Sequence, residues 1–166
     1  AVGGVISLSS SMPDKIGFNQ EHFIEGGSYG TVKNSHSFKF LNKKVSLVFN
    51  IDSEKSSGYN SFIDTSLAHF EKDGYYLYGT NFLSNFKINQ NLELNLRGRS
   101  YYQHNEYDDN YSYPGDSLLH YRYDKAKALL LDILYSNNNF NHKFTFQPTY
   151  TTRINASSYG RYEYDG

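Results

Sequence analysis

Leu92-Glu93-Leu94-Asn95-Leu96-Arg97-Gly98-Arg99 alternates between leucine or glycine at even positions and polar or charged residues at odd positions. Residues 45–52 have an apolar side chain at every odd position, and residues 140–150 have theirs mainly at even positions. A period of two places alternate side chains on opposite faces of a β-strand. The sequence therefore predicts an all-β fold whose strands each have one apolar face.

The connections between these segments decide what the apolar face contacts. Tight turns are expected at 42–43, 89–91 and 137–139, and long polar stretches at about 53–74, at about 103–117 and from Asn155 onward. Consecutive strands of a meander run in opposite directions, so the short turns all lie at one end and the long loops at the other. This asymmetry is typical of outer-membrane barrels, although a soluble β-sandwich can also have uneven loops. We expect an antiparallel up-and-down meander that forms part of a transmembrane β-barrel, with strands near 17–26, 31–41, 44–52, 75–88, 92–102, 119–135 and 140–154, and the start of an eighth.

Composition agrees with this expectation and excludes several classes of protein. The 166 residues include 17 Tyr and 12 Phe but no Trp, which aromatic girdles at a membrane interface would explain; aromatic residues also simply favour strands. Mean hydropathy is −0.68, and no apolar run reaches the length of a membrane helix. The net charge of −1 gives no case for nucleic acid binding. Cysteine is absent, which excludes disulfides and thiol catalysis.

Alternation also predicts which side chains face lipid. Leucine and phenylalanine positions should face outward, while the alternate polar positions face the lumen, because a charge on the lipid face costs about 2–4 kcal/mol at the midplane. The outward set is Leu92, Leu94, Leu96, Phe144 and Phe146, and the inward set includes Asn95, Arg97, Arg99, Lys143, Thr145, Gln147 and Arg153.

Several short stretches resemble a known family. Residues 1–8 contain a Gly-Gly pair followed by an apolar segment, and residues 26–30 precede a strand with Phe38 and Phe40. Together they resemble the end of the plug and the first barrel hairpin of TonB-dependent outer-membrane receptors. Within that family, four further stretches are similar to loops of cobalamin receptors: 58–60, 73–75, 107–122 and 159–162.

The resemblance implies that residues 1–12 are the C-terminal end of a plug domain and that residues 13–166 are the N-terminal part of a barrel, with about seven or eight strands. The implied function is uptake of cobalamin or a related corrinoid across the bacterial outer membrane, in contact with its lipid. The TonB complex would drive uptake through an upstream segment. The chain begins with Ala1 rather than Met, which agrees with a piece of a longer protein. Three alternatives remain: a receptor for haem or an iron chelate, a structural or adhesive outer-membrane barrel, and a soluble β-sandwich that binds a ligand.

Carboxylates of two long loops are candidate metal ligands. Calcium takes six to eight oxygen ligands, and the resemblance implies a calcium site at Glu71, Asp73, Asp108 and Asp109; otherwise these residues are solvated. Asn60 and His120 stand where the family pattern has Asp, so we expect one ion at most. Aromatic and amide side chains of the same loops suit a large amphipathic ligand, or a membrane interface. The candidate ligand-binding residues are Tyr59, Asn60, Tyr111 and Tyr113.

Nothing in the sequence predicts catalysis. The six histidines are scattered, without the spacing of a zinc site. No nucleophile motif is present. We therefore expect a transport protein rather than an enzyme.

Overall fold

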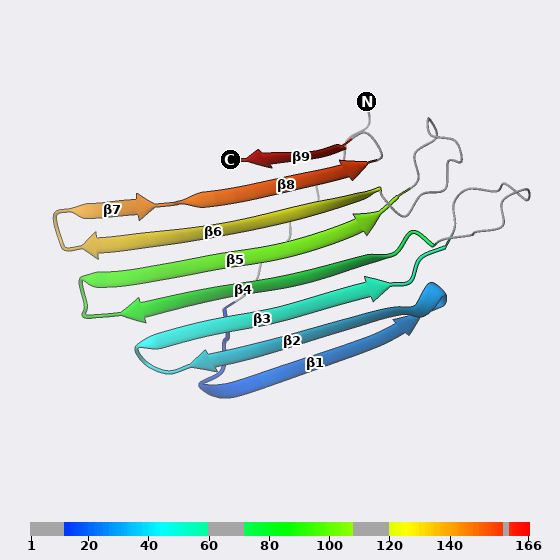
Figure 1. Ribbon diagram of the computed structural model, residues 1–166. Helices are drawn as coiled ribbons and strands as arrows, with labels where there is room; N and C mark the ends of the chain where they lie inside the picture. The colour runs from blue at the N-terminus through cyan, green and yellow to red at the C-terminus, as the bar shows by residue number, and fades with distance from the viewer. Residues whose placement is uncertain (1–11, 60–71, 108–119, 158–159) are drawn as a thin grey trace, which may run out of the picture.

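The computed structural model describes residues 12–59, 72–107, 120–157 and 160–166. In these residues, nine strands form one antiparallel sheet in a single layer. The strands lie side by side in chain order, except that β7 and β8 follow one another along the same side of β6 (Figure 1). The strands are β1 Gly17–Gly27, β2 Thr31–Leu41, β3 Val45–Ser56, β4 Tyr75–Lys87, β5 Leu92–Glu106, β6 Tyr121–Ser136, β7 Asn141–Phe146, β8 Thr149–Ser157 and β9 Gly160–Asp165. The all-β antiparallel meander predicted from the alternation is confirmed.

The sheet is open. Among the described residues, β1 pairs only with β2, and β9 pairs only with β8. A closed barrel has no such edges, so the described strands do not form a complete barrel.

Three short turns lie together at one end of the sheet, as the sequence predicts (Figure 1). Each of them uses an asparagine in the same way. The side-chain oxygens of Asn42, Asn89 and Asn137 each accept hydrogen bonds from the backbone N–H groups two and three residues later, at 2.7–2.9 Å. This side-chain bond replaces a backbone turn contact, which explains why asparagine occurs at all three positions.

The opposite end carries the long connections, from β3 to β4 and from β5 to β6, together with a short 3₁₀ turn, η1 Ser28–Gly30, between β1 and β2. The expectation of a long loop from Asn155 onward is wrong. Asn155 lies within β8 and is paired with Tyr162 of β9, so that β8 and β9 form a hairpin. Tyr162 and Tyr164 alternate with charged residues, and this alternation is sufficient for a strand although the stretch looks polar.

The strand expected at 140–154 is present but interrupted. Phe146 lies opposite Leu131, and Thr149 lies opposite Ala128, so β7 and β8 pair with β6 in one continuous register. Pro148 has no N–H to donate, while its carbonyl still accepts a hydrogen bond from the Leu129 backbone N–H at 3.1 Å. The proline therefore splits one predicted strand into two, which explains why nine strands are found instead of seven and the start of an eighth.

The register separates the side chains into two faces. One row across the sheet reads Leu47, Ser84, Leu96, Leu131 and Phe146, and the next reads Ser46, Asn85, Asn95, Asp132 and Thr145. We call these the apolar face and the polar face. The predicted segregation of Leu92, Leu94, Leu96, Phe144 and Phe146 from Asn95, Arg97, Arg99, Lys143, Thr145 and Arg153 is confirmed, while Gln147 lies at the interruption.

The apolar face is closely packed where a glycine faces an aromatic ring. Gly98 lies directly opposite Phe82, whose ring occupies the space above the glycine. A Cβ at this position would lie 2.3 Å from Cε1 of Phe82. Gly98 is therefore required by the ring of its neighbour, and a larger residue would displace Phe82.

Candidate functional site

Ion pairs cross the strands of the polar face. Asp124 of β6 accepts a hydrogen bond at 2.7 Å from Nε of Arg122 and another at 2.7 Å from Nε of Arg153 on β8. Nearer the short turns, Asp132 accepts a hydrogen bond from Oγ1 of Thr145 at 2.6 Å and lies 3.3 Å from Nζ of Lys143. The carboxylates are largely buried, and each has a cationic partner on the neighbouring strand.

Amides extend this hydrogen-bonded network along the polar face. Nδ2 of Asn85 donates to Oδ1 of Asn95 at 2.8 Å, and Nδ2 of Asn95 donates to Glu93 at 3.2 Å. Asn50 and Asn81 form a similar pair at 2.7 Å. Cross-strand bonds of this kind hold neighbouring strands in one register. The polar face is therefore an ordered hydrogen-bonding surface rather than the apolar core of a soluble protein.

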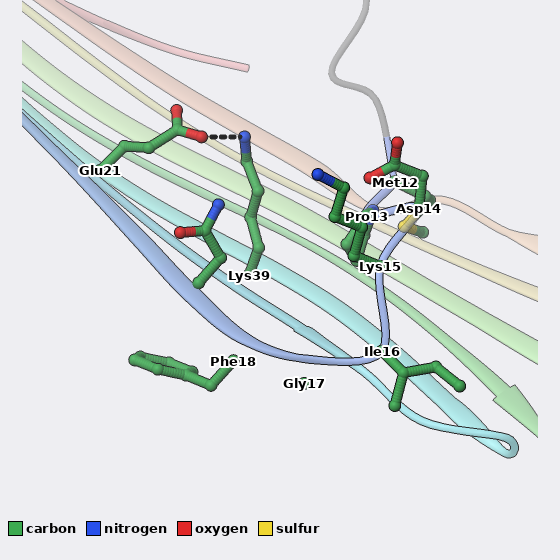
Figure 2. Close-up of a pocket in the computed structure, with 10 residues that line it drawn as sticks. Met12, Pro13, Asp14, Lys15, Ile16, Gly17, Phe18, Glu21 and Lys39 are labelled. Carbon is green, nitrogen blue, oxygen red and sulfur yellow. Dashed lines mark hydrogen bonds and ion pairs between the residues drawn. The ribbon is translucent and has the colours of Figure 1, made fainter.

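The residues that precede β1 lie on the polar side of the sheet. The hydroxyl of Ser46, a polar-face residue, lies 3.4 Å from Sδ of Met12. A cavity of about 730 Å³ separates residues 12–16 from β1 and β2. Figure 2 shows the Glu21–Lys39 ion pair, at 2.9 Å, on the cavity side of β1, with Phe18 pointing to the opposite side.

An aromatic belt lies on the apolar face close to the long connections. It consists of Tyr76, Tyr78, Tyr102, His104, Tyr121 and Tyr123, from β4, β5 and β6. Ring centroids of Tyr76 and Tyr102 are 5.6 Å apart, and those of Tyr102 and Tyr123 are 5.8 Å apart. The ring of His104 stacks on that of Tyr76 at 4.8 Å and is tilted by 47° against that of Tyr123 at 4.6 Å.

A band of aliphatic and phenylalanine side chains lies between this belt and the short turns. On β6 the band comprises Leu129, Leu131 and Ile133. The tyrosines of the same face on either side of it, Tyr123 and Tyr135, are about 40 Å apart at ~3.3 Å per residue. At the ~45° tilt of barrel strands, that is about 28 Å along a barrel axis, close to the thickness of a bilayer core. Lys125 and Lys127 lie on the same face beside the belt, and Nζ of Lys125 is 5.5 Å from the centroid of the Tyr102 ring.

Two predicted site residues are brought together where the connection between β3 and β4 begins and ends. The backbone N–H of Asp73 donates to the carbonyl of Tyr59 at 3.3 Å. Gly58 has a positive φ of 68°, and a Cβ there would lie 1.8 Å from the Asp73 carbonyl oxygen. Only glycine permits this close approach of the two chain segments. The other candidates, Asn60, Glu71, Asp108, Asp109, Tyr111 and Tyr113, lie outside the described residues.

The bases of the two long connections are linked by Glu106. Its Oε2 accepts a hydrogen bond from the Gly74 backbone N–H at 2.9 Å, and its own N–H donates to the Gly74 carbonyl at 3.0 Å. His120 is 1% exposed, and its ring stacks on that of Tyr107 at 5.8 Å. In the part of the chain that the structure describes, no three His, Cys, Asp or Glu side chains are grouped as a metal site.

The sequence-based reasoning missed one close pair of histidines. His22 of β1 and His36 of β2 lie directly opposite each other on the apolar face, with their Nδ1 atoms 2.7 Å apart. The two residues are equally distant from Tyr29, at the centre of the first hairpin. In a hairpin centred on Tyr29, residues at equal distances from the centre lie opposite each other, so the predicted hairpin is sufficient to identify the pair. No short sequence motif indicates it.

Comparison with protein-family models, curated proteins and solved structures finds no match to this chain. Within the described residues, no helix has the length and apolar character needed to cross a bilayer. The assignment of function therefore rests on the residues and geometry of the chain itself.

Proposed function

We propose that this chain forms part of the wall of a β-barrel in a bacterial outer membrane. The observation that carries the proposal is the separation of side chains into two faces, with an aromatic belt at one border of the apolar face. Phe144 and Phe146 of that face are 60% and 54% exposed, so the surface needs an apolar environment. In a soluble β-sandwich a second sheet would cover it, whereas the described strands lie in one layer.

Lipid explains more of this surface than a second sheet does. A sheet-on-sheet core has no need of a tyrosine belt near one end, whereas tyrosines sit at headgroup level in membrane barrels. The lysines beside the belt would be costly in a closed core but can extend to headgroups at a membrane border. The polar face, with its ion pairs between β6, β7 and β8, suits the water-filled or plugged interior of a barrel.

The finer proposal is a TonB-dependent receptor for cobalamin or a related corrinoid. It rests on the resemblance of the loop sequences and is supported by Met12, the last residue of the expected plug segment, which contacts Ser46 of the polar face. Tyr59 stands beside Asp73 at the base of one long connection, where a ligand from outside would arrive. In this proposal the barrel binds and transports its ligand, and calcium orders the acidic loops.

The test is binding of cyanocobalamin to the full-length protein in isolated outer membranes, with haem and a ferric chelate as parallel probes. We expect saturable cobalamin binding that is weakened by Tyr59→Ala and unchanged by Tyr135→Ala, which removes a tyrosine at the short-turn end. If haem or the ferric chelate binds and cobalamin does not, the proposed ligand is wrong and the protein is a receptor for the probe that binds. If none of the three probes binds, the receptor proposal is refuted and the structural or adhesive barrel is favoured.

A further inference from the structure

The geometry points to a copper(II) site at the His22–His36 pair. The two residues are direct cross-strand partners, and their ring centroids are 5.0 Å apart at an interplanar angle of 62°. His22 is exposed and His36 is half-buried, so an ion from solution can reach the pair from the side of β1. The inference uses only the register of β1 and β2 and does not depend on the proposed function.

The spacing of the two nitrogens favours one kind of ion. Two nitrogens at ~2.05 Å from a metal are about 2.9 Å apart at a right angle and about 3.3 Å apart at a tetrahedral angle. The 2.7 Å between the Nδ1 atoms is a hydrogen-bond distance, and a slight opening of the pair brings it to the first value. Right angles are those of a tetragonal site, which copper(II) prefers, and copper(II) also binds imidazole more tightly than the other divalent ions of the first row.

Binding requires a small change in the pair. At 2.7 Å one imidazole donates its Nδ1 proton to the other. Copper would replace that proton, which passes to solvent, and a modest rotation of the rings about Cβ–Cγ would direct both lone pairs at the ion. Water completes the coordination, and the amide groups of Gln20 and Asn34, each two residues away on the same face, can hydrogen-bond to that water.

The position of the pair relative to the aromatic belt keeps it in reach of water. Tyr102 of the belt is the direct partner of Tyr78, and the same line of register partners continues through Ser53 to Asn34 on β2. His36 is two residues from Asn34, which is about 7 Å along the strand. In a membrane the pair would therefore lie at the border, not at the midplane.

Copper titration of the full-length protein in detergent at about pH 7.5 tests the site, with electron paramagnetic resonance as the readout. We expect one saturable ion per chain whose spectrum shows two imidazole nitrogens. His22→Gln and His36→Gln should each weaken binding by at least about tenfold, because loss of even an outer-shell partner typically costs that much. His142→Gln, at an exposed histidine of the short-turn end, should leave the titration unchanged.

A double variant distinguishes a wrong register from a wrong metal site. With His22→Cys and His36→Cys together, mild oxidation should form a disulfide, because directly opposite residues lie within its reach. A disulfide without copper binding by the natural pair would overturn the metal site. Absence of the disulfide would overturn the pairing on which it rests, and an unchanged two-nitrogen spectrum in His22→Gln would place the ion elsewhere.

Discussion

Neighbouring leucines on β6 provide a matched test of the two faces. Leu131 lies on the apolar face, between Leu96 and Phe146, whereas Leu130 lies on the polar face opposite Arg97. Leu131→Arg places a charge in the apolar band, which costs about 2–4 kcal/mol near the midplane of a bilayer. Leu130→Arg places the same charge on the polar face, where repulsion from Arg97 costs less than about 1 kcal/mol and the nearby Asp132 offsets part of it.

The expected difference is measurable as a folding equilibrium. At 1.36 kcal/mol per factor of ten, Leu131→Arg should reduce the folded-to-unfolded ratio roughly thirtyfold to nearly a thousandfold. The assay is urea unfolding of the full-length protein in lipid vesicles, with gel mobility of the folded form as the readout. If Leu130→Arg is as destabilising as Leu131→Arg, the apolar face does not contact lipid and the reasoning fails.

Three further predictions concern topology, the polar network and the loops. An epitope inserted at Asn138 should stay hidden on intact cells, while one near Ser57 should be labelled. Surface labelling at Asn138 would show that the short turns face the cell exterior, opposite to the proposed orientation. Asp124→Asn should cost about 1–2 kcal/mol in unfolding free energy by removing the charge shared by two arginines, and an unchanged midpoint would show that this network is dispensable. The double variant Asp73→Asn and Asp109→Asn should abolish any calcium dependence of ligand affinity while the barrel still assembles. If the unaltered protein binds its ligand with the same affinity in calcium and in chelator, the calcium site is refuted.

The faces and the tight turns could be predicted because each depends on local features. Alternation with a period of two assigns a face to Leu94 or Asn95 without knowledge of the partner strand. An asparagine that caps the backbone two and three residues later defines a turn by itself. The error at Asn155 has a related cause: β9 alternates tyrosine with charged residues, and its overall polarity is typical of a loop.

The site was less predictable because it depends on register and on long connections. The contact between Tyr59 and Asp73 needs Gly58 in a left-handed conformation, and the sequence shows the glycine but not its φ. The His22–His36 pair depends on the exact centre of a hairpin, and a shift of one residue would separate the two rings. The strand count differed because Pro148 interrupts hydrogen bonding without changing the register.

Spin-label accessibility along β6 tests whether the apolar face meets lipid. Labels placed one at a time at residues 128–133 of the full-length protein in vesicles report contact with oxygen, which is enriched in lipid, or with a water-soluble nickel complex. We expect strict alternation, with residues 129, 131 and 133 accessible to oxygen and residues 128, 130 and 132 shielded from it. If 129, 131 and 133 are instead accessible to the nickel complex or buried from both probes, the apolar face does not meet lipid, and the membrane barrel is contradicted.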